Sequence, residues 1–314
     1  MHKSGQLLIE AKSIGSIAID VLSKDQAGLV ISSISRGIYI KSASRWLIFI
    51  SCESFRSPLT ITLNEAIPLT NPIQAGTMVH FASKQLLFPE AGIKIAANDH
   101  SVWKPASRGN SPAIRSDRKE RLNYFAKEAL LRKQGVGFCS LLPGLLELSA
   151  ETQPINQALV PIYENIILLQ QYFQEGKLPL VGKILCDFLG FGEGLTPSGD
   201  DYVIGTLLSL NRWKDVLFPN EDLGGLNQQV VEAAYQATTS LSANLIECAT
   251  LGQGDERLID AIDYLMCGSI QEDEIMTNLL NWGNSSGADT FAGMATALSA
   301  MDTDQEVGFL TASA

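Results

Sequence analysis

Two short segments of the chain place serine, glycine and aspartate at the same spacing. Residues 198–205 read SGDDYVIG and residues 286–293 read SGADTFAG, so both follow the pattern Ser-Gly-x-Asp-x-x-x-Gly. The glycine-rich stretch GFGEGLTP comes directly before the first copy. Amides in such loops and at helix starts bind anions, and carboxylates bind Mg²⁺. These segments therefore indicate a site for a small anionic substrate together with a metal ion.

Helix capping is the competing explanation of each copy taken alone. In Ser-x-x-Asp at a helix start, the serine oxygen accepts a bond from an amide of the first turn, and the acid reaches back to the cap. Asp201 and Asp289 would be those returning acids. A cap does not need Asp200, and it does not need the glycines at 192, 194 and 199. These surplus residues favour a ligand site.

The glycines that end the two copies predict a helix crossing. Gly205 and Gly293 lie inside apolar helical patterns. Glycine costs about 1 kcal/mol relative to alanine at such positions. Close approach of another backbone would explain why the chain tolerates that cost. If the two helix starts converge, their amides form one positive pocket beside three carboxylates.

We expect Asp200, Asp201 and Asp289 to be catalytic, with Asp200 and Asp201 as the Mg²⁺ ligands. Thr238 and Ser242 lie one turn apart in an expected long helix, so their hydroxyls share a face. Hydroxyl bonds to carbonyls of the preceding turn are the open alternative for this pair. The positions expected to bind substrate or anion are Gly192, Gly194, Thr196, Ser198, Gly199, Thr238, Ser242, Ser285, Ser286 and Gly287.

Composition excludes several classes of protein. A length of 314 residues with 46% hydrophobic and 18% charged residues is typical of a folded chain with room for two domains. A net charge of −11 argues against a nucleic-acid partner. Apolar runs such as WLIFI are too short to span a membrane, and residues 1–13 lack the apolar core of an export signal. We therefore expect a cytoplasmic protein with no membrane partner.

The cysteines and histidines limit the chemistry further. The five cysteines are widely spaced without a C-x-x-C motif, which indicates reduced thiols. The three histidines all lie in the first 100 residues. A Ser-His-Asp triad or a histidine zinc site wholly within the second half is therefore impossible. Arg56, beside a proline turn, is either a solvated edge residue or reaches an anion across a domain interface.

The two halves of the chain differ in charge and in hydrophobic period. Residues 1–118 hold 13 Lys and Arg against 8 Asp and Glu, whereas residues 119–314 hold 10 against 26. We expect an α+β protein: residues 1–118 form an antiparallel β barrel or sandwich domain with a linker, and residues 119–314 form an all-helical domain carrying the Gly-rich and Asp motif. Strands are expected at 15–23, 28–35, 37–42, 46–51, 59–64 and 76–83. Helices are expected from a capping box at Asp117 and Glu120, and at 155–174, 178–189, 200–213, 226–250, 256–267, 272–282 and 288–300.

Three segments, GEGLTPSGDD (192–201), TTSLSANL (238–245) and SSGAD (285–289), occur in this order. With them the chain resembles the AllH-type family, a former family of unknown function that includes a subunit of bacterial oxamate carbamoyltransferase. The resemblance implies a role in purine (allantoin) breakdown, in which oxalurate and phosphate yield oxamate and carbamoyl phosphate. It also implies a hetero-oligomer with other carbamoyltransferase subunits as partners. The resemblance supplies no catalytic residues.

Two other classes of function remain open from the residues. A stand-alone Mg²⁺-dependent hydrolase or phosphotransferase would use the same carboxylates on a bound water or phosphoryl group. A non-catalytic assembly module would use the two helix starts only for packing. Turnover by the purified chain without partners favours the first class, and the absence of any ligand binding favours the second.

Overall fold

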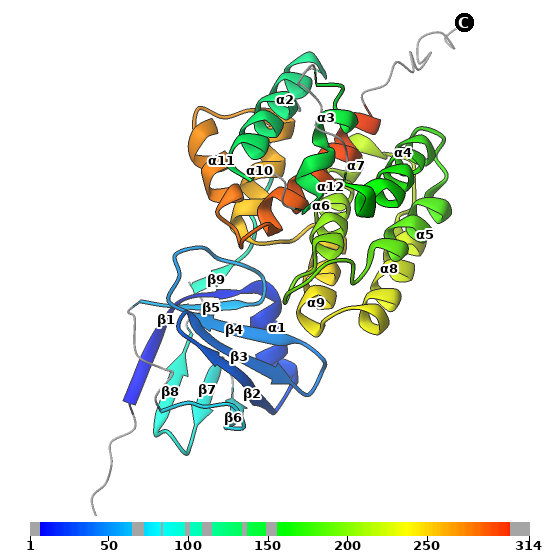
Figure 1. The fold of residues 1–314 in the computed structure, drawn as a ribbon. Coiled ribbons are helices and arrows are strands. Elements are labelled where there is room, and N and C mark those ends of the chain that lie inside the picture. Colours follow the sequence, from blue (N-terminus) through cyan, green and yellow to red (C-terminus); the bar gives the residue numbers. More distant parts are fainter. Residues whose placement is uncertain are drawn as a thin grey trace, which may run out of the picture.

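The computed structural model describes residues 7–64, 72–82, 84–97, 101–108, 115–133, 137–148 and 156–301. All described strands fall in residues 7–103, which we call the β region, and helices make up the helical region, residues 115–301 (Figure 1). An α+β fold with the strands first is therefore confirmed. The changeover lies between Trp103, where the last described strand ends, and Arg115, where the first helix of the helical region begins.

The β region is one mixed sheet. The strands are β1 (Leu7–Gly15), β2 (Ala27–Ile34), β3 (Gly37–Ser42), β4 (Leu47–Ser51), β5 (Thr60–Leu63), β6 (Met78–Ala82), β7 (Gln85–Phe88), β8 (Ile93–Ala96) and β9 (Val102–Trp103). Their order is β5-β4-β3-β2-β6-β7-β8-β1-β9, and β5 also pairs with β1, so the sheet closes on itself. Most pairs are antiparallel as expected, but β1–β8, β1–β9 and β4–β5 are parallel.

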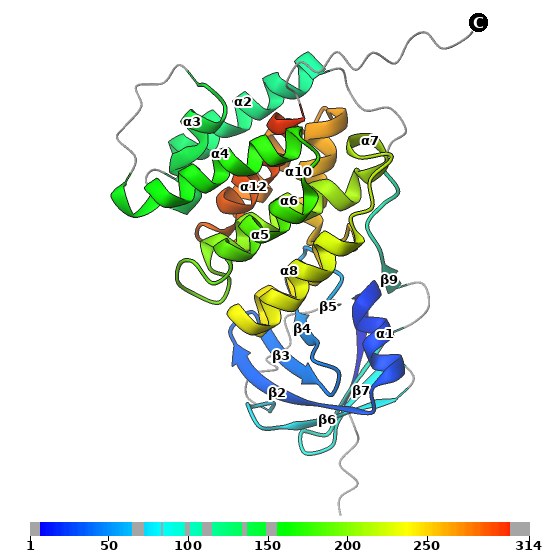
Figure 2. The same ribbon diagram turned by 90° about the vertical axis from the view of Figure 1, so that its right-hand side faces the viewer.

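The prediction of a strand at residues 15–23 is wrong. This segment forms the helix α1 (Ser16–Lys24), which lies beside the sheet (Figure 2). Its buried Ile17, Ala18, Val21 and Leu22 share one helix face, and apolar residues at these spacings fit a helix as well as a short strand. The amides of Ile17 and Ala18 both donate to the Pro58 carbonyl, at 3.1 and 2.9 Å, which fixes the start of the helix. The strands β1, β7, β8 and β9 were not expected from the sequence.

The helical region contains the expected helices, but the first of them begins before its expected cap, the helix expected at 226–250 is broken, and the short helices Gly137–Leu141, Leu142–Leu145 and Lys214–Leu217 were not expected. Its α-helices are α2 (Arg115–Arg132), α3 (Leu142–Leu145), α4 (Val160–Gln174), α5 (Leu178–Phe188), α6 (Ser198–Arg212), α7 (Lys214–Leu217), α8 (Gly224–Ala237), α9 (Ser240–Thr250), α10 (Glu256–Cys267), α11 (Glu272–Leu280) and α12 (Ser286–Ala300). The 3₁₀ helices η2 (Gly137–Leu141) and η3 (Gln157–Leu159) complete it. The α2 helix begins before Asp117, so Asp117 lies in its first turn and does not cap it. Residue 155 lies outside the described residues.

The expected long helix at 226–250 is broken into α8 and α9. Thr238 ends α8 in an extended conformation (φ −135°, ψ −172°), and the Thr239 hydroxyl caps α9 by accepting a bond from the Ser242 amide at 3.1 Å. The hydrophobic period continues across this break, so periodicity alone could not reveal it. The Thr-Thr-Ser sequence carries the signal, because threonine and serine are preferred caps.

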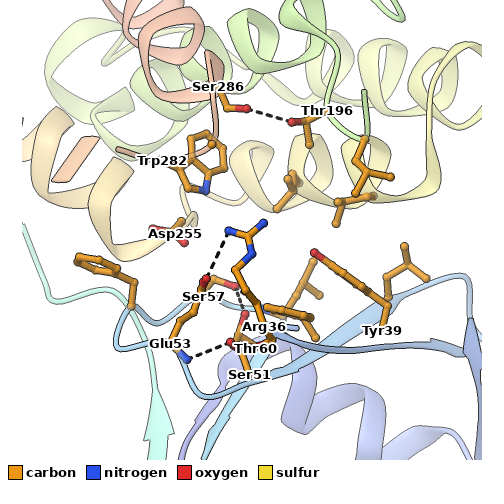
Figure 3. A pocket seen from close by; sticks show the side chains of 18 of the residues that line it. Arg36, Tyr39, Ser51, Glu53, Ser57, Thr60, Thr196, Asp255, Trp282 and Ser286 are labelled. Atoms are coloured by element: carbon orange, nitrogen blue, oxygen red, sulfur yellow. Dashed lines mark hydrogen bonds and ion pairs between the residues drawn. The ribbon is translucent and has the colours of Figure 1, made fainter. Parts of the chain in front are cut away.

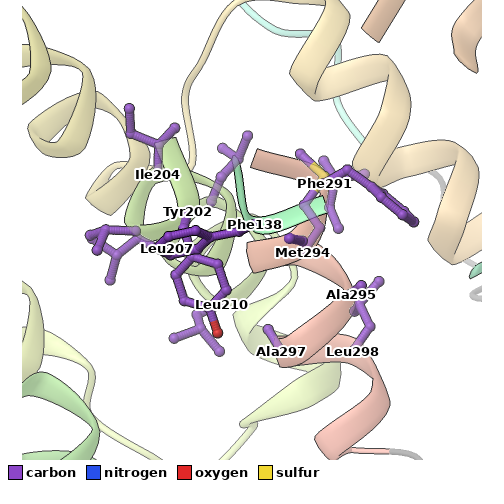
Figure 4. Close-up of a cluster of buried hydrophobic side chains, with 14 of the residues drawn as sticks. Phe138, Tyr202, Ile204, Leu207, Leu210, Phe291, Met294, Ala295, Ala297 and Leu298 are labelled. Carbon is purple, nitrogen blue, oxygen red and sulfur yellow. The ribbon is translucent and has the colours of Figure 1, made fainter. Parts of the chain in front are cut away.

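Two hydrophobic cores lie on either side of the interface between the regions. The sheet and α1 enclose one core, and α6 and α12 lie at the centre of the other, buried on nearly every face (Figure 4). Asn244 of α9 joins the regions, because its fully buried Oδ1 accepts a bond from the Leu47 amide at 2.7 Å. No described helix is both long and apolar enough to cross a membrane.

Candidate functional site

The helices α6 and α12 cross at the two glycines that end the repeated motif. A Cβ atom added at Gly205 would lie 1.9 Å from the Thr290 carbonyl oxygen, and one added at Gly293 would lie 2.0 Å from the Tyr202 carbonyl oxygen. Thr290 holds in α12 the motif position that Tyr202 holds in α6. The crossing is thus reciprocal, and it confirms that the two helix starts converge. Only glycine lets the two backbones approach this closely.

Each motif aspartate faces the motif serine of the other helix, and Asp289 also faces Ser285, the N-cap residue of its own helix. Ser286 of α12 faces Asp201 of α6, and Ser198 of α6 faces Asp289 of α12. Neither helix has a side-chain bond at its N-cap. The capping-box explanation of the two copies is therefore wrong, because each serine meets the acid of the other copy.

These carboxyl groups are buried without a cation. Asp200, Asp201 and Asp289 are all 0% exposed, and no salt bridge reaches them in the part of the chain that the structure describes. Burial raises the pKa of Asp201 well above its usual range, opposed by the hydroxyls of Ser286 and Thr196 and supported by the neighbouring Asp289 and Asp200. Burial likewise raises the pKa of Asp289 to about 6, although the Ser198 hydroxyl and the Phe138 amide lower it.

The three aspartates differ in the hydrogen bonds that their carboxyl oxygens accept. The Asp289 Oδ1 atom accepts a bond from the Phe138 amide at 2.6 Å, while its Oδ2 has no hydrogen-bond partner among the described residues. Neither oxygen of Asp201 reaches hydrogen-bonding geometry with a described group. Asp200 accepts from the Gly190 amide at 2.8 Å and from the Thr238 hydroxyl. Asp200, which a cap does not need, therefore anchors the glycine-rich loop to the end of α8.

The predicted Mg²⁺ site finds little support in this arrangement. Among the described residues, no three His, Cys, Asp or Glu side chains lie close enough together to hold a metal ion. Asp200 already uses both oxygens within the chain. Mg²⁺ prefers octahedral oxygen ligands, and only Asp201 and Asp289 offer unpartnered carboxylate oxygens. Because both Asp200 oxygens are occupied, the donor set does not fit Mg²⁺ held by Asp200 and Asp201 as the sequence predicts.

The glycines of the motif pack against backbone and do not present free amides. The Gly199 amide donates to the Phe191 carbonyl at 2.8 Å, and the Gly287 amide donates to the Trp282 carbonyl at 2.9 Å. A Cβ at Gly199 or Gly287 would lie 2.0 or 1.8 Å from a carbonyl oxygen of a neighbouring segment. In this conformation neither amide is available to an anion, contrary to expectation.

The remaining loop residues shape the entrance to the helix starts. Gly192 and Gly194 have φ values of +111° and +100°, which only glycine adopts readily. The Leu195 carbonyl accepts bonds from the Thr239 hydroxyl at 2.7 Å and from the Ser242 hydroxyl at 3.4 Å. Thr239 and Ser242 thus hold the loop in place, whereas the Thr238 hydroxyl donates to Asp200. Thr238 ends α8 and Ser242 lies in α9, so the two do not share one helix face.

A pocket of about 200 Å³ lies between the β region and these helix starts (Figure 3). Thr196 and Ser286 belong to its helical wall, and their hydroxyl oxygens lie 3.2 Å apart. These are the hydroxyls that face Asp201, so the pair separates the pocket from the buried acid. Among the predicted site residues, Thr196 and Ser286 are those that line this interface pocket.

Sequence reasoning missed the other wall of the pocket. The β region contributes Arg36, Tyr39, Leu47, Phe49, Ser51, Glu53, Phe55, Ser57, Leu59 and Thr60, and the helical region adds Leu195, Leu241, Leu245, Asp255, Arg257, Trp282 and Gly283. No shared motif links these positions in the sequence. Arg56 was the available signal, because it does reach across the interface. It binds the Glu256 carboxylate there, so its partner is a side chain of this protein.

The fold and the pocket can be set beside the comparison with known proteins. This chain has a closed mixed sheet followed by a helical region, with a ligand-sized pocket between them and acids buried behind its hydroxyl wall. Residues 188–298 match the protein family described as oxamate carbamoyltransferase subunit AllH, the family that the three sequence segments resemble. The matched residues contain α6, α9 and all but the last two residues of α12, with the convergent helix starts. No curated protein and no solved structure matches the chain.

Proposed function

We propose that this chain is a subunit of a carbamoyltransferase resembling oxamate carbamoyltransferase, which converts oxalurate and phosphate to oxamate and carbamoyl phosphate. The observation that carries the proposal is the interface pocket, whose Thr196 and Ser286 wall lies within the residues that match the AllH family. Ligand sites commonly lie where two structural units meet, with a few polar groups among apolar walls.

The proposed roles follow from the groups that line the pocket. The hydroxyls of Thr196 and Ser286 bind and orient the carbamoyl group, because a hydroxyl both donates to a carbonyl oxygen and accepts from an amide. The Asp201 carboxyl stands behind these hydroxyls, with Asp289 as its neighbour. The reaction forms a bond between a phosphate oxygen and the carbamoyl carbon and breaks the bond from that carbon to the oxamate nitrogen. That nitrogen takes up a proton as it leaves.

The proposal is tested by measuring carbamoyl phosphate formation by the enzyme purified with its partner subunits. Thr196→Val and Ser286→Ala should each lower kcat/KM about tenfold or more, since losing a hydrogen bond to a buried polar group costs about 1–3 kcal/mol. Ser240→Ala is the matched control, because Ser240 begins α9, is exposed and does not line the pocket. Unchanged kinetics in both pocket variants would contradict the proposal.

A non-catalytic assembly module is the second candidate. The amides of Gly199 and Gly287 favour it, since both donate to carbonyls of the chain. Under this alternative the chain is required for the complex but binds no substrate. A stand-alone Mg²⁺-dependent enzyme is a further alternative, and turnover by the chain alone would support it. Calorimetric titration of the chain with Mg²⁺ tests the metal directly, and an Asp201→Asn variant tests whether that carboxylate is a ligand.

A further inference from the structure

Each cation that lines the interface pocket already has a carboxylate partner. Arg36 lies 3.4 Å from Glu53, and both residues line the pocket. Arg257 binds Asp255 through two bonds, from Nε and Nη2, each 2.8 Å long. The charged side chains of the described pocket wall therefore sum to zero. A pocket that binds a phosphate dianion by itself normally carries surplus positive charge or free amides.

The end of the pocket near the motif adds no cation among the described residues, and two of its glycine amides, those of Gly199 and Gly287, are occupied. Asp201 lies behind Thr196 and Ser286, and Asp289 and Asp200 are its neighbours. The Gly199 and Gly287 amides donate to carbonyls of the chain. Lys133 donates to the Asn284 carbonyl at 2.6 Å and does not line the pocket. A doubly charged anion placed here would meet partnered cations and buried acids.

The same wall offers binding groups for an organic anion that carries one carboxylate and amide groups. Arg257 uses Nε and Nη2 for Asp255, so Nη1 is free of hydrogen bonds among the described residues and can bind one carboxylate. Its guanidinium also lies 4.4 Å from the centre of the Phe55 ring, which fixes its position. Thr196 and Ser286 offer hydroxyls that both donate and accept.

We propose that the interface pocket binds the carbamoyl-bearing organic substrate and excludes inorganic phosphate, and that a partner chain supplies the cation that binds phosphate at the pocket mouth. This inference rests on the proposed carbamoyl-transfer function and divides its two substrates between chains. Because residues 119–314 hold 10 Lys and Arg against 26 Asp and Glu, a basic surface is the complementary partner. Leu195, 66% exposed on the glycine-rich loop at the pocket, offers that partner an apolar contact.

Calorimetry with two probes, oxamate and inorganic phosphate, tests the division. The purified chain should bind oxamate, and it should bind phosphate at least about 100-fold more weakly, because each uncompensated charge costs about 1–4 kcal/mol at 4 Å. The enzyme assembled with its partner subunits should bind both probes. Phosphate binding by the chain alone within tenfold of oxamate would overturn the inference while leaving carbamoyl transfer intact.

A gain-of-binding variant adds an independent test. Glu53→Gln removes the partner of the exposed Arg36, so the isolated chain should gain phosphate affinity at least about tenfold, and it should gain less affinity for oxamate, because oxamate carries the smaller charge. Glu90→Gln removes the same charge at an exposed position outside the pocket and should gain nothing. An equal change in phosphate affinity in the two variants would contradict the electrostatic argument. An assembled enzyme that neither binds oxamate nor forms carbamoyl phosphate would instead refute the proposed function.

Discussion

Replacing Gly205 with alanine probes the helix crossing on which the whole site depends. The added Cβ would lie 1.9 Å from the Thr290 carbonyl oxygen, whereas ordinary contact begins near 3.4 Å. The two helices would have to separate by about 1.5 Å to accommodate it, and neither can yield easily because both are buried in the core of the helical region. The clash is with backbone, so no side-chain rotation relieves it.

The expected magnitude is the difference between two opposing effects. Alanine in place of glycine inside a helix gains about 1 kcal/mol from propensity. Overpacking of a buried contact costs about 1–3 kcal/mol, and more where backbone must move. We therefore expect Gly205→Ala to lower the free energy of unfolding by about 2 kcal/mol or more. Gly293→Ala should behave alike, because its Cβ would lie 2.0 Å from the Tyr202 carbonyl oxygen.

Urea denaturation followed by circular dichroism measures this effect, with Gly225→Ala as the matched control. Gly225 lies in the first turn of α8 and an added Cβ there meets no atom within 4 Å, so the substitution should be neutral or stabilising. Because the crossing sets the position of both helix starts, Gly205→Ala should also weaken oxamate binding. Stability equal to wild type in both motif variants would show that the close approach does not exist in solution.

Three further results are expected. Asp200→Asn should lower the free energy of unfolding by about 1–3 kcal/mol, because the amide nitrogen cannot accept the bonds from the Gly190 amide and the Thr238 hydroxyl; an unchanged urea midpoint would contradict this. The pKa of Asp289 is raised to about 6, so the folded state holds an extra proton between about pH 4 and 6. The folded state therefore loses stability as pH rises through that window. Asp289→Asn should flatten this part of the profile of melting temperature against pH and should raise the melting temperature at pH 7.5. Asn244→Ala should cost about 1–3 kcal/mol by leaving the Leu47 amide without its partner, and faster hydrogen exchange at that amide should report the loss.

Local chemistry made the helix crossing predictable from the sequence. A glycine inside an apolar helix is costly unless another backbone comes close, and two such glycines at the same place in a repeated motif predict that the helices approach each other. The order of strands before helices was also predictable, because the spacing of hydrophobic residues changes from that of strands to that of helices along the chain. The prediction of a strand at residues 15–23 was wrong, since a nine-residue apolar pattern fits the spacing of both a strand and a helix.

The roles of the acids and glycines were decided by the tertiary structure. Ser198 and Asp201 have the spacing of a capping box, yet Ser198 meets Asp289 and Asp201 meets Ser286. The two copies of the motif lie 88 positions apart in the sequence. Sequence spacing fixes which groups share one helix, but only packing fixes which groups of two helices meet. Asp200 likewise became a loop anchor because Thr238 leaves the helix at a break that the hydrophobic period does not mark.

The interface pocket lay furthest from what the sequence could determine. The motif residues Thr196 and Ser286 were predictable, since their segments carry the glycine and serine pattern and the family resemblance. Arg36 and Arg257 were not, because side chains more than 200 positions apart come together only when the sheet packs against α9 and α10. The sequence alone determined which residues could start helices and bind polar groups. The tertiary structure decided their charge environment, because pairing of Arg36 with Glu53 and Arg257 with Asp255 depends on distances in space.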